Sequence, residues 1–393
     1  MKYIIFKIFL IISLLYHFEA YSKATDHKYF NHRYLSNYFS ALLSYDNKDN
    51  DEALRYFNSS KYLLNKHENF LKAYVFSLVA DGQVSKAIKQ VNYLKKKENS
   101  NFFEAKLLLA LHSVKKRNFV KTSKYLLSMK GLYEEDSYEY IIYHTLKSYN
   151  QLFINKSLDK KEHKFGRLSL INFAFQNCYL NSEQTNSNFI KLINTPDGDY
   201  SRYLFFYLTN LLKIKDYNKA LDIVEKIDPL NSSLIISQSK KWVDKKKFEN
   251  FNKFFSCNSE SDLLAEFFFL IGSIYSSQED YERSNFYLNI SNYLNPKFNF
   301  NLSLLAENYY LIGDYESTKK VLNKLNTENK IYEWYKIKRV TQIIESQKGK
   351  DKSIQFIENK FKKINDPSIK ILFDMGTIYK NNKKFKKAIE YYS

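Results

Sequence analysis

The sequence predicts an all-α protein, a solenoid of stacked pairs of short helices. Glycine occurs only 8 times and proline only 4 times in 393 residues, so few residues interrupt a helix. Apolar residues make up 44% of the chain, which suffices for a continuous core. Small or short side chains recur beside polar turns, and several successive ones are 34 or 35 residues apart, as a repeated helix pair requires. These positions are Ala53, Ala87, Thr122, Ala220, Ser284, Thr318, Ser353 and Ala388.

The clearest unit is the last stretch, residues 369–393. Two amphipathic patterns flank a polar turn, and Gly376 and Ala388 are small where two helices must approach closely. Together with Tyr379, Phe385 and Tyr392 they hold the relative places of a known signature. The stretch therefore resembles a tetratricopeptide repeat (TPR), a helix–turn–helix unit of about 34 residues. The resemblance implies a right-handed α-solenoid in which each repeat contacts only its neighbours.

The same pattern recurs upstream, most clearly in residues 270–296 and 304–325. From Tyr34 to Ser393 the chain resembles long exported bacterial TPR proteins, which carry many degenerate repeats. The TPR register assigns eight residues to packing within and between repeats. They are Ala53, Ala87, Ala220, Gly272, Tyr275, Gly376, Tyr379 and Ala388.

Residues 1–24 have the features of a signal peptide. Lys2 provides a charged start, residues 8–15 are apolar, and residues 22–24 form a small-x-small cleavage site. The apolar run is shorter than the roughly 20 residues of a comfortable membrane span. If the signal is not cleaved, it would remain as a signal anchor. We expect export to the periplasm of a bacterial cell envelope.

The mature chain divides into three parts. Residues 25–130 contain N-terminal TPR-like repeats, residues 131–200 contain degenerate helical repeats, and residues 201–393 contain C-terminal TPR-like repeats, the last of them incomplete. The turn at residues 196–199 predicts a kink in the superhelix. Because no polar capping helix follows the last repeat, we expect either a truncated chain or a last face covered by a partner.

No catalytic, cofactor or metal motif is present in the sequence. The seven histidines and two cysteines show no zinc spacing, and no nucleophile elbow or phosphate-binding glycine loop occurs. Residues 47–51 resemble a calcium loop, but Glu52 and Asn58 stand where glycine and glutamate are needed. Glu134, Glu135 and Asp136 are expected in a solvated turn. We therefore predict no enzyme activity, no cofactor and no metal.

The two cysteines, Cys178 and Cys257, are predicted to remain unpaired. They lie about two repeats apart, and a disulfide needs Cα atoms within about 7 Å. If each repeat contacts only its neighbours, the two thiols cannot meet.

The formal net charge of +19 has two interpretations. The lysines are spread over every repeat and fit solvated helix faces. No nucleic-acid-binding signature accompanies them, so no nucleic-acid partner is predicted. A lysine-driven cell-wall or membrane binder remains an alternative.

The TPR resemblance also implies a concave groove lined by the first helices of the repeats. The groove positions transferred from the family include Tyr38, Lys72, Phe76, Phe205, Phe269, Glu307 and Phe373. Since Lys72 is followed by Phe76 where the family's carboxylate clamp has asparagine, the clamp is broken. An aromatic groove suits an extended peptide or an amphipathic helix, although the same aromatics could instead fill a tightly wound superhelix.

These observations predict a non-enzymatic TPR scaffold for protein–protein interaction in the cell envelope. The alternative is the superhelical domain of a periplasmic cell-wall enzyme of the lytic-transglycosylase kind, with its catalytic part outside the sequence. The partner and the oligomeric state stay open.

Overall fold

The computed structural model describes residues 31–47, 49–66, 69–94, 100–159, 164–195, 202–298, 300–325 and 330–393. The predicted signal peptide and the predicted kink at residues 196–199 lie outside these ranges. Within them every regular element is a helix and no strand occurs, and successive helices pack as pairs, so the predicted all-α solenoid is confirmed. No described helix is both long enough and apolar enough to cross a membrane.

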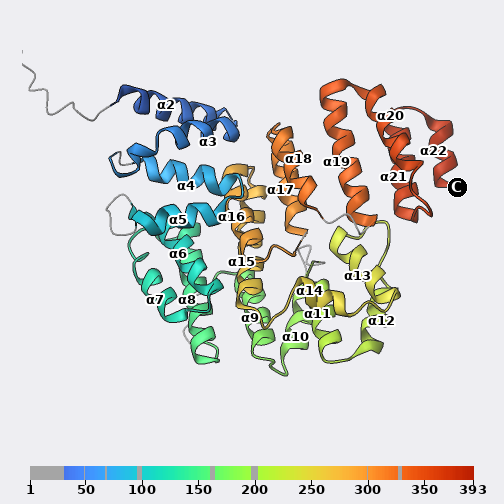
Figure 1. The fold of residues 1–393 in the computed structure, drawn as a ribbon. Helices are drawn as coiled ribbons and strands as arrows, with labels where there is room; N and C mark the ends of the chain where they lie inside the picture. The colour runs from blue at the N-terminus through green and yellow to red at the C-terminus, as the bar shows by residue number, and fades with distance from the viewer. Residues whose placement is uncertain are drawn as a thin grey trace, which may run out of the picture.

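Most of the helices form antiparallel hairpins that follow one another along the chain (Figure 1). The N-terminal part contains α2 (His32–Asp46), α3 (Asn50–Ser59), the 3-10 helix η2 (Lys61–Asn65), α4 (Phe70–Ala80), α5 (Val84–Leu94), α6 (Phe103–Lys115), α7 (Phe119–Leu127) and α8 (Tyr138–Asn155). The middle contains α9 (Arg167–Tyr179), α10 (Thr185–Ile193), α11 (Arg202–Lys213), α12 (Tyr217–Glu225), α13 (Leu234–Asp244) and α14 (Glu249–Phe254). The C-terminal part contains α15 (Glu260–Ser277), α16 (Tyr281–Leu294), α17 (Phe300–Leu311), α18 (Tyr315–Lys324), α19 (Lys330–Lys348), α20 (Lys350–Phe361), α21 (Ile369–Asn381) and α22 (Phe385–Tyr392).

A common turn joins the two helices of several hairpins. The residue before the cap has a positive φ, as in Lys215, Glu279 and Gly313. The next residue is an aspartate, and its side chain accepts a hydrogen bond from a backbone N–H in the first turn of the second helix. This cap satisfies a donor that the helix itself leaves unpaired. The turn ends one helix and starts the next within three residues, so the two helices pack as an antiparallel pair.

The residues assigned to repeat packing are all buried. Gly272 shows why one of them must be small. A Cβ atom there would lie 2.8 Å from Cγ of Leu288 and 3.2 Å from the backbone oxygen of Ser284 on α16. Glycine therefore allows α15 and α16 to approach more closely than any residue with a side chain would.

The hairpin α15–α16 lies in the middle of the molecule, with α4, α5 and α6 on one side and α17 on the other (Figure 1). Helix α16 packs on α4 and α5, and α15 packs on α6, although these pairs are far apart in the sequence. The expectation that each repeat contacts only its neighbours is therefore wrong. The superhelix winds tightly enough for its C-terminal repeats to enter the concave side of its N-terminal ones.

A second long-range contact joins the C-terminal repeats to the middle of the chain. Helix α13 packs on α19, and the Lys370 ammonium donates hydrogen bonds to the carbonyl oxygens of Leu230 and Ser232, at 3.0 and 2.9 Å. One apolar cluster runs from Tyr38 to Phe298, while the last two hairpins share a separate cluster that reaches from Trp334 to Ala388.

Candidate functional site

Helix α16 packs against α4, the helix that carries the predicted groove residues Lys72 and Phe76. Phe76 of α4 stacks on Phe286 of α16, with ring centroids 4.7 Å apart. The side-chain amide of Asn289 donates to the carbonyl oxygen of Ala80 at the end of α4 (3.0 Å). Helix α16 thus lies against α4 and α5 and is buried along most of its length.

Polar contacts secure both ends of the central hairpin. The Tyr45 hydroxyl donates to Glu282 at the start of α16 (2.5 Å). At the start of α15, Glu260 accepts hydrogen bonds from the Tyr179 hydroxyl (2.9 Å) and from Nε of Arg117 (3.1 Å). The hairpin is therefore connected to α2, α9 and the turn that follows α6, as well as to the groove floor.

The other predicted groove residues also lie mostly in intramolecular contacts. Tyr38 is buried against Phe57 and Phe70 of its own and the next repeat. Phe205 is 1% exposed and stacks on Phe251.

Two further predicted groove positions carry a charged side chain, and a third carries an exposed aromatic ring. Lys72 is exposed, and Glu307 forms an ion pair with Arg339. Phe373 is 45% exposed and has Tyr392 at 5.4 Å between ring centroids. Among the predicted aromatic groove residues, Phe373 is thus the one that the structure leaves exposed.

Phe269 belongs to a buried cluster around an ion pair that the sequence did not reveal. Two guanidinium nitrogens of Arg202 contact the two carboxylate oxygens of Glu266 at 2.8 and 2.6 Å. The guanidinium also lies over the ring of Phe269, 3.8 Å from its centroid, and over that of Phe300 at 4.3 Å. Glu266 directly precedes an apolar run, so nothing near it in the sequence identified its partner.

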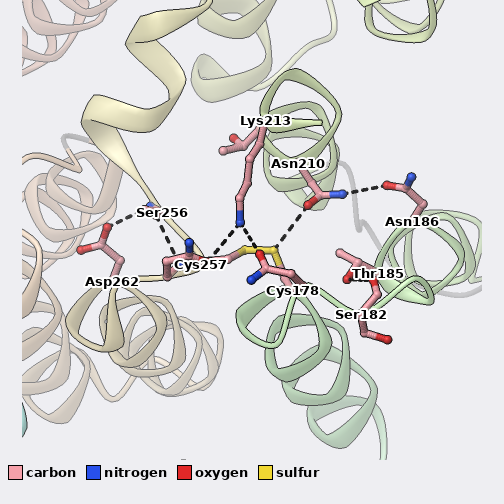
Figure 2. Close-up of a disulfide and its surroundings, with 12 residues drawn as sticks. Cys178, Ser182, Thr185, Asn186, Asn210, Lys213, Ser256, Cys257 and Asp262 are labelled. Atoms are coloured by element: carbon pink, nitrogen blue, oxygen red, sulfur yellow. Dashed lines mark hydrogen bonds between the residues drawn. A yellow bond between two sulfur atoms is a disulfide. The ribbon is translucent and has the colours of Figure 1, made fainter. Parts of the chain in front are cut away.

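Cys178 and Cys257 form a disulfide, so the prediction of two unpaired thiols is wrong. Their Cα atoms lie 5.6 Å apart although the cysteines are separated by 79 residues. Figure 2 shows the bond between the end of α9 and the segment that leads into α15, with Asn210 and Lys213 of α11 beside it. The prediction assumed contact between neighbouring repeats only, and the tight winding brings these two segments together.

The C-terminal hairpin presents an apolar face that no described residue covers. Its large apolar side chains are among the most exposed of the described chain. They are Ile369 and Phe373 on α21, and Phe385, Ile389 and Tyr392 on α22. Exposed apolar residues gathered on two adjacent helices are typical of interaction surfaces.

The described residues contain no group of three or more histidine, cysteine, aspartate or glutamate side chains that could hold a metal ion. Glu134, Glu135 and Asp136 are exposed, as expected for a solvated turn.

Comparison with known proteins identifies the repeat. The family model described as tetratricopeptide repeat matches residues 369–393. No curated protein matches the chain significantly.

Solved structures also match, with low overall similarity. The crystal structure of yeast Tom70 matches with 12% identity, covering 91% of this chain and 83% of that chain, at a TM-score of 0.26. The human IFIT1 dimer with m7Gppp-AAAA matches with 14% identity, covering 91% of this chain and 88% of that chain, at a TM-score of 0.25. Scores this low do not describe a shared overall shape, so the assignment rests on the matched repeat and the series of similar hairpins.

TPR repeats generally mediate contacts between proteins and are not catalytic. The matched unit, α21–α22, has small buried residues and a positive-φ residue in its turn, Lys383, as the hairpins before it do, but no side chain caps the start of α22. The chain is therefore an all-α protein of successive helical hairpins that contains a tetratricopeptide repeat at residues 369–393.

Proposed function

We propose that this protein is an interaction scaffold of the cell envelope, and that it binds its protein partner through the exposed face of α21–α22. The observation that carries the proposal is the set of exposed apolar side chains around Phe373, Phe385 and Ile389. Helix α16 packs against α4 and α5 in the N-terminal part, so we place the partner surface where the predicted groove residue Phe373 is exposed. Such a surface binds a partner by removing apolar area from water.

Two observations support the envelope. The N-terminal residues have the charged start, apolar run and small-residue site of a signal peptide. The disulfide between Cys178 and Cys257 is a bond that persists in oxidising compartments such as the periplasm and is rare in the cytosol. Cell fractionation, combined with thiol trapping in intact cells, should place the protein in the envelope with both cysteines oxidised. A cytosolic protein with reduced cysteines would contradict this part of the proposal.

The docking face is tested with two matched charge substitutions. Ile389 of α22 and Leu43 of α2 are both 64% exposed, and they lie in the last and first described hairpins. Ile389→Lys should abolish capture of the partner from envelope extracts, whereas Leu43→Lys should leave it unchanged. Both variants should keep the wild-type melting temperature, because neither position is buried.

Two results would reject this surface. One is a captured protein that the Ile389→Lys and Phe385→Lys variants still bind. The other is a captured set of proteins that Ile389→Lys and Leu43→Lys reduce equally, since this would indicate nonspecific adsorption to apolar surface. If sedimentation shows self-association that Ile389→Lys removes, the partner is a second copy of the chain.

A further inference from the structure

The second helices of several hairpins pack on the first helix of the next hairpin. Helix α7 packs on α8 in this way, and α16 packs on α17. The contact involves the residue directly after the short side chain of the repeat pattern. Ser123 accepts a hydrogen bond from Asn150 of α8 at 2.7 Å, and Asn285 accepts one from Asn308 of α17 at 2.9 Å. In α5 the same position is Ile88, which is 4% exposed. This position therefore marks the face of a second helix that the next helix contacts.

Helix α22 has the same face, but no described helix covers it (Figure 1). The equivalent residue is Ile389, directly after the buried Ala388, and it is 64% exposed. Three residues later Tyr392 is 43% exposed, whereas its counterparts in α5, α7, α16 and α18 are at most 4% exposed. These counterparts are Val91, Leu126, Leu288 and Leu322. The exposed face of α22 thus has the pattern that a packed helix covers elsewhere in the same chain.

The residue that precedes α22 departs from the pattern of the other hairpins. In four of them the second helix begins after an aspartate whose side chain accepts a hydrogen bond from the first turn. These aspartates are Asp49, Asp216, Asp280 and Asp314. In α22 the same place holds Lys384, and no side chain caps the helix. A lysine there is unfavourable, because the N-terminus of a helix carries partial positive charge. A local rule that is broken at a cost in stability indicates a functional position.

Lys384 belongs to a run of lysines that we call the lysine turn, residues 380–387. The run contains five lysines and no acidic residue. One of them forms an ion pair with Glu358 of α20. Lys383, Lys384 and Lys386 are exposed and form no ion pair with a described residue. The exposed apolar face of α22 therefore begins beside concentrated positive charge.

The direction of packing determines which end of a covering helix meets the lysine turn. Asn285 near the start of α16 contacts Asn308 near the end of α17, so these two helices run antiparallel. A helix that covers α22 in the same way has its last turns beside the lysine turn. Carboxylates in those turns are unfavourable in the isolated helix, because its C-terminus carries partial negative charge. The two unfavourable ends attract each other in the complex.

We propose that α22 binds an amphipathic helix of the partner protein, and that this helix carries acidic residues in its last turns. The inference rests on the docking face proposed for α21–α22 and adds the chemistry of the partner. Apolar side chains of the bound helix cover Ile389 and Tyr392, as the next helix does in other hairpins. Its carboxylates meet the lysine turn, which repels a basic helix of the same apolar pattern.

The test uses the full chain and two labelled peptides of about 18 residues, a length at which an isolated helix begins to form. Both carry leucines on one helical face, and their last turns contain glutamates in one peptide and lysines in the other. Fluorescence anisotropy should show the acidic peptide binding with a stoichiometry of one and about tenfold more tightly than the basic one. Ile389→Ser should weaken the acidic peptide about tenfold. Leu43→Ser, at a residue that is also 64% exposed, should have no effect.

A substitution at Lys384 separates binding from folding. Lys384→Asp restores the aspartate cap of the other hairpins, so it should raise the melting temperature. It also reverses a charge of the lysine turn, so it should weaken the acidic peptide about tenfold. Lys130→Asp makes the same charge change in the turn between α7 and α8 and should leave the affinity within about twofold. A merely structural role of Lys384 does not predict higher stability together with weaker binding.

The inference is overturned if the acidic and basic peptides bind equally, or if Lys384→Asp binds the acidic peptide as tightly as Lys130→Asp does. It is also overturned if neither peptide binds, while phosphatidylglycerol vesicles or a second copy of the chain bind in a way that depends on Ile389. Partner capture that depends on Ile389, with peptides that bind alike, would refute only the acidic helix. Capture that is independent of Ile389 would instead refute the proposed docking face.

Discussion

Arg202 and Glu266 show how one residue pair can stabilise a contact that local sequence does not reveal. Their side chains are 11% and 1% exposed, and the carboxylate and guanidinium meet through two short hydrogen bonds. The surrounding phenylalanines exclude water and supply cation–π contacts. Each charge is tolerated inside the core only because the other is present.

Removing one partner of this pair should be costly. Glu266→Ala leaves the guanidinium buried without its counter-charge, so we expect the free energy of unfolding to fall by about 3–5 kcal/mol. The control is Glu52→Ala, which breaks the exposed pair of Arg55 and Glu52 and should cost less than about 1 kcal/mol. Urea unfolding of both variants measures the difference, and similar losses would show that burial does not set the energy of the pair.

Two helical glycines provide a second comparison at the residue scale. In Gly272→Ala the new methyl group meets the buried Leu288 and the backbone of Ser284, so we expect a loss of about 1–3 kcal/mol. In Gly376→Ala the methyl group meets only the half-exposed ring of Tyr392 at 2.5 Å. That ring can rotate away, and the better helix propensity of alanine offsets the remaining cost. Thermal unfolding should rank Gly272→Ala well below Gly376→Ala, and the reverse order would contradict the close approach of α15 and α16.

At the scale of elements, the helices of the separate C-terminal cluster are joined by a hydrogen bond that responds to pH. The hydroxyl of Tyr379 on α21 donates to the carboxylate of Glu358 on α20 at 2.7 Å. This hydrogen bond, followed by the charge of Lys387, holds the pKa of Glu358 below its ordinary value of 4.5. The folded state thus favours the ionised carboxylate more than the unfolded state does.

The sign of the pH effect follows from that lowered pKa. The stabilisation is fully present above the unfolded pKa and is lost as the pH falls through the lower folded pKa. Glu358→Gln should therefore lose less stability than the wild type on acidification below about pH 4.5, and at neutral pH it should cost no more than about 1 kcal/mol. Chemical denaturation at neutral and acidic pH measures both values. Parallel losses in the two proteins would mean that Glu358 does not contribute to acid sensitivity.

Local patterns predicted most of the helices, because short-range spacing and capping determine them. The clearest upstream units, residues 270–296 and 304–325, contain the hairpins α15–α16 and α17–α18. Their polar turns hold the aspartates that cap the second helices, Asp280 and Asp314. The ion pair of Arg202 and Glu266 was not predicted, because the two residues are 64 apart in the sequence.

At the scale of the whole molecule, the winding of the solenoid determines which distant helices come into contact, and the sequence analysis did not predict this. Helical periodicity specifies which face of a helix is apolar but not which distant helix covers it. Phe76 and Phe205 were predicted to line a groove for a partner, and in the structure they contact Phe286 and Phe251 of the same chain. The disulfide was missed for the same reason.

The disulfide should contribute substantially to stability. It closes a loop with a sequence separation of 79 residues, for which loop-closure entropy corresponds to about 4 kcal/mol. Replacing both cysteines by alanine should lower the unfolding free energy by about that amount, and the reduced wild type should behave alike. Thiol titration of the denatured, unreduced protein should find no free thiol. Two titratable thiols per chain would show that the bond does not form.

The central position of α15–α16 has a consequence for how the chain is made. Asn289 of α16 and Ala80 contact each other across 209 residues, a length that a ribosome adds in roughly 10–40 s. During that interval the first repeats have their helices but not the hairpin that will cover Phe76 and its neighbours. A nascent chain in this state exposes the apolar side chains that the hairpin later covers. It therefore depends on a chaperone or on rapid completion of synthesis to avoid aggregation.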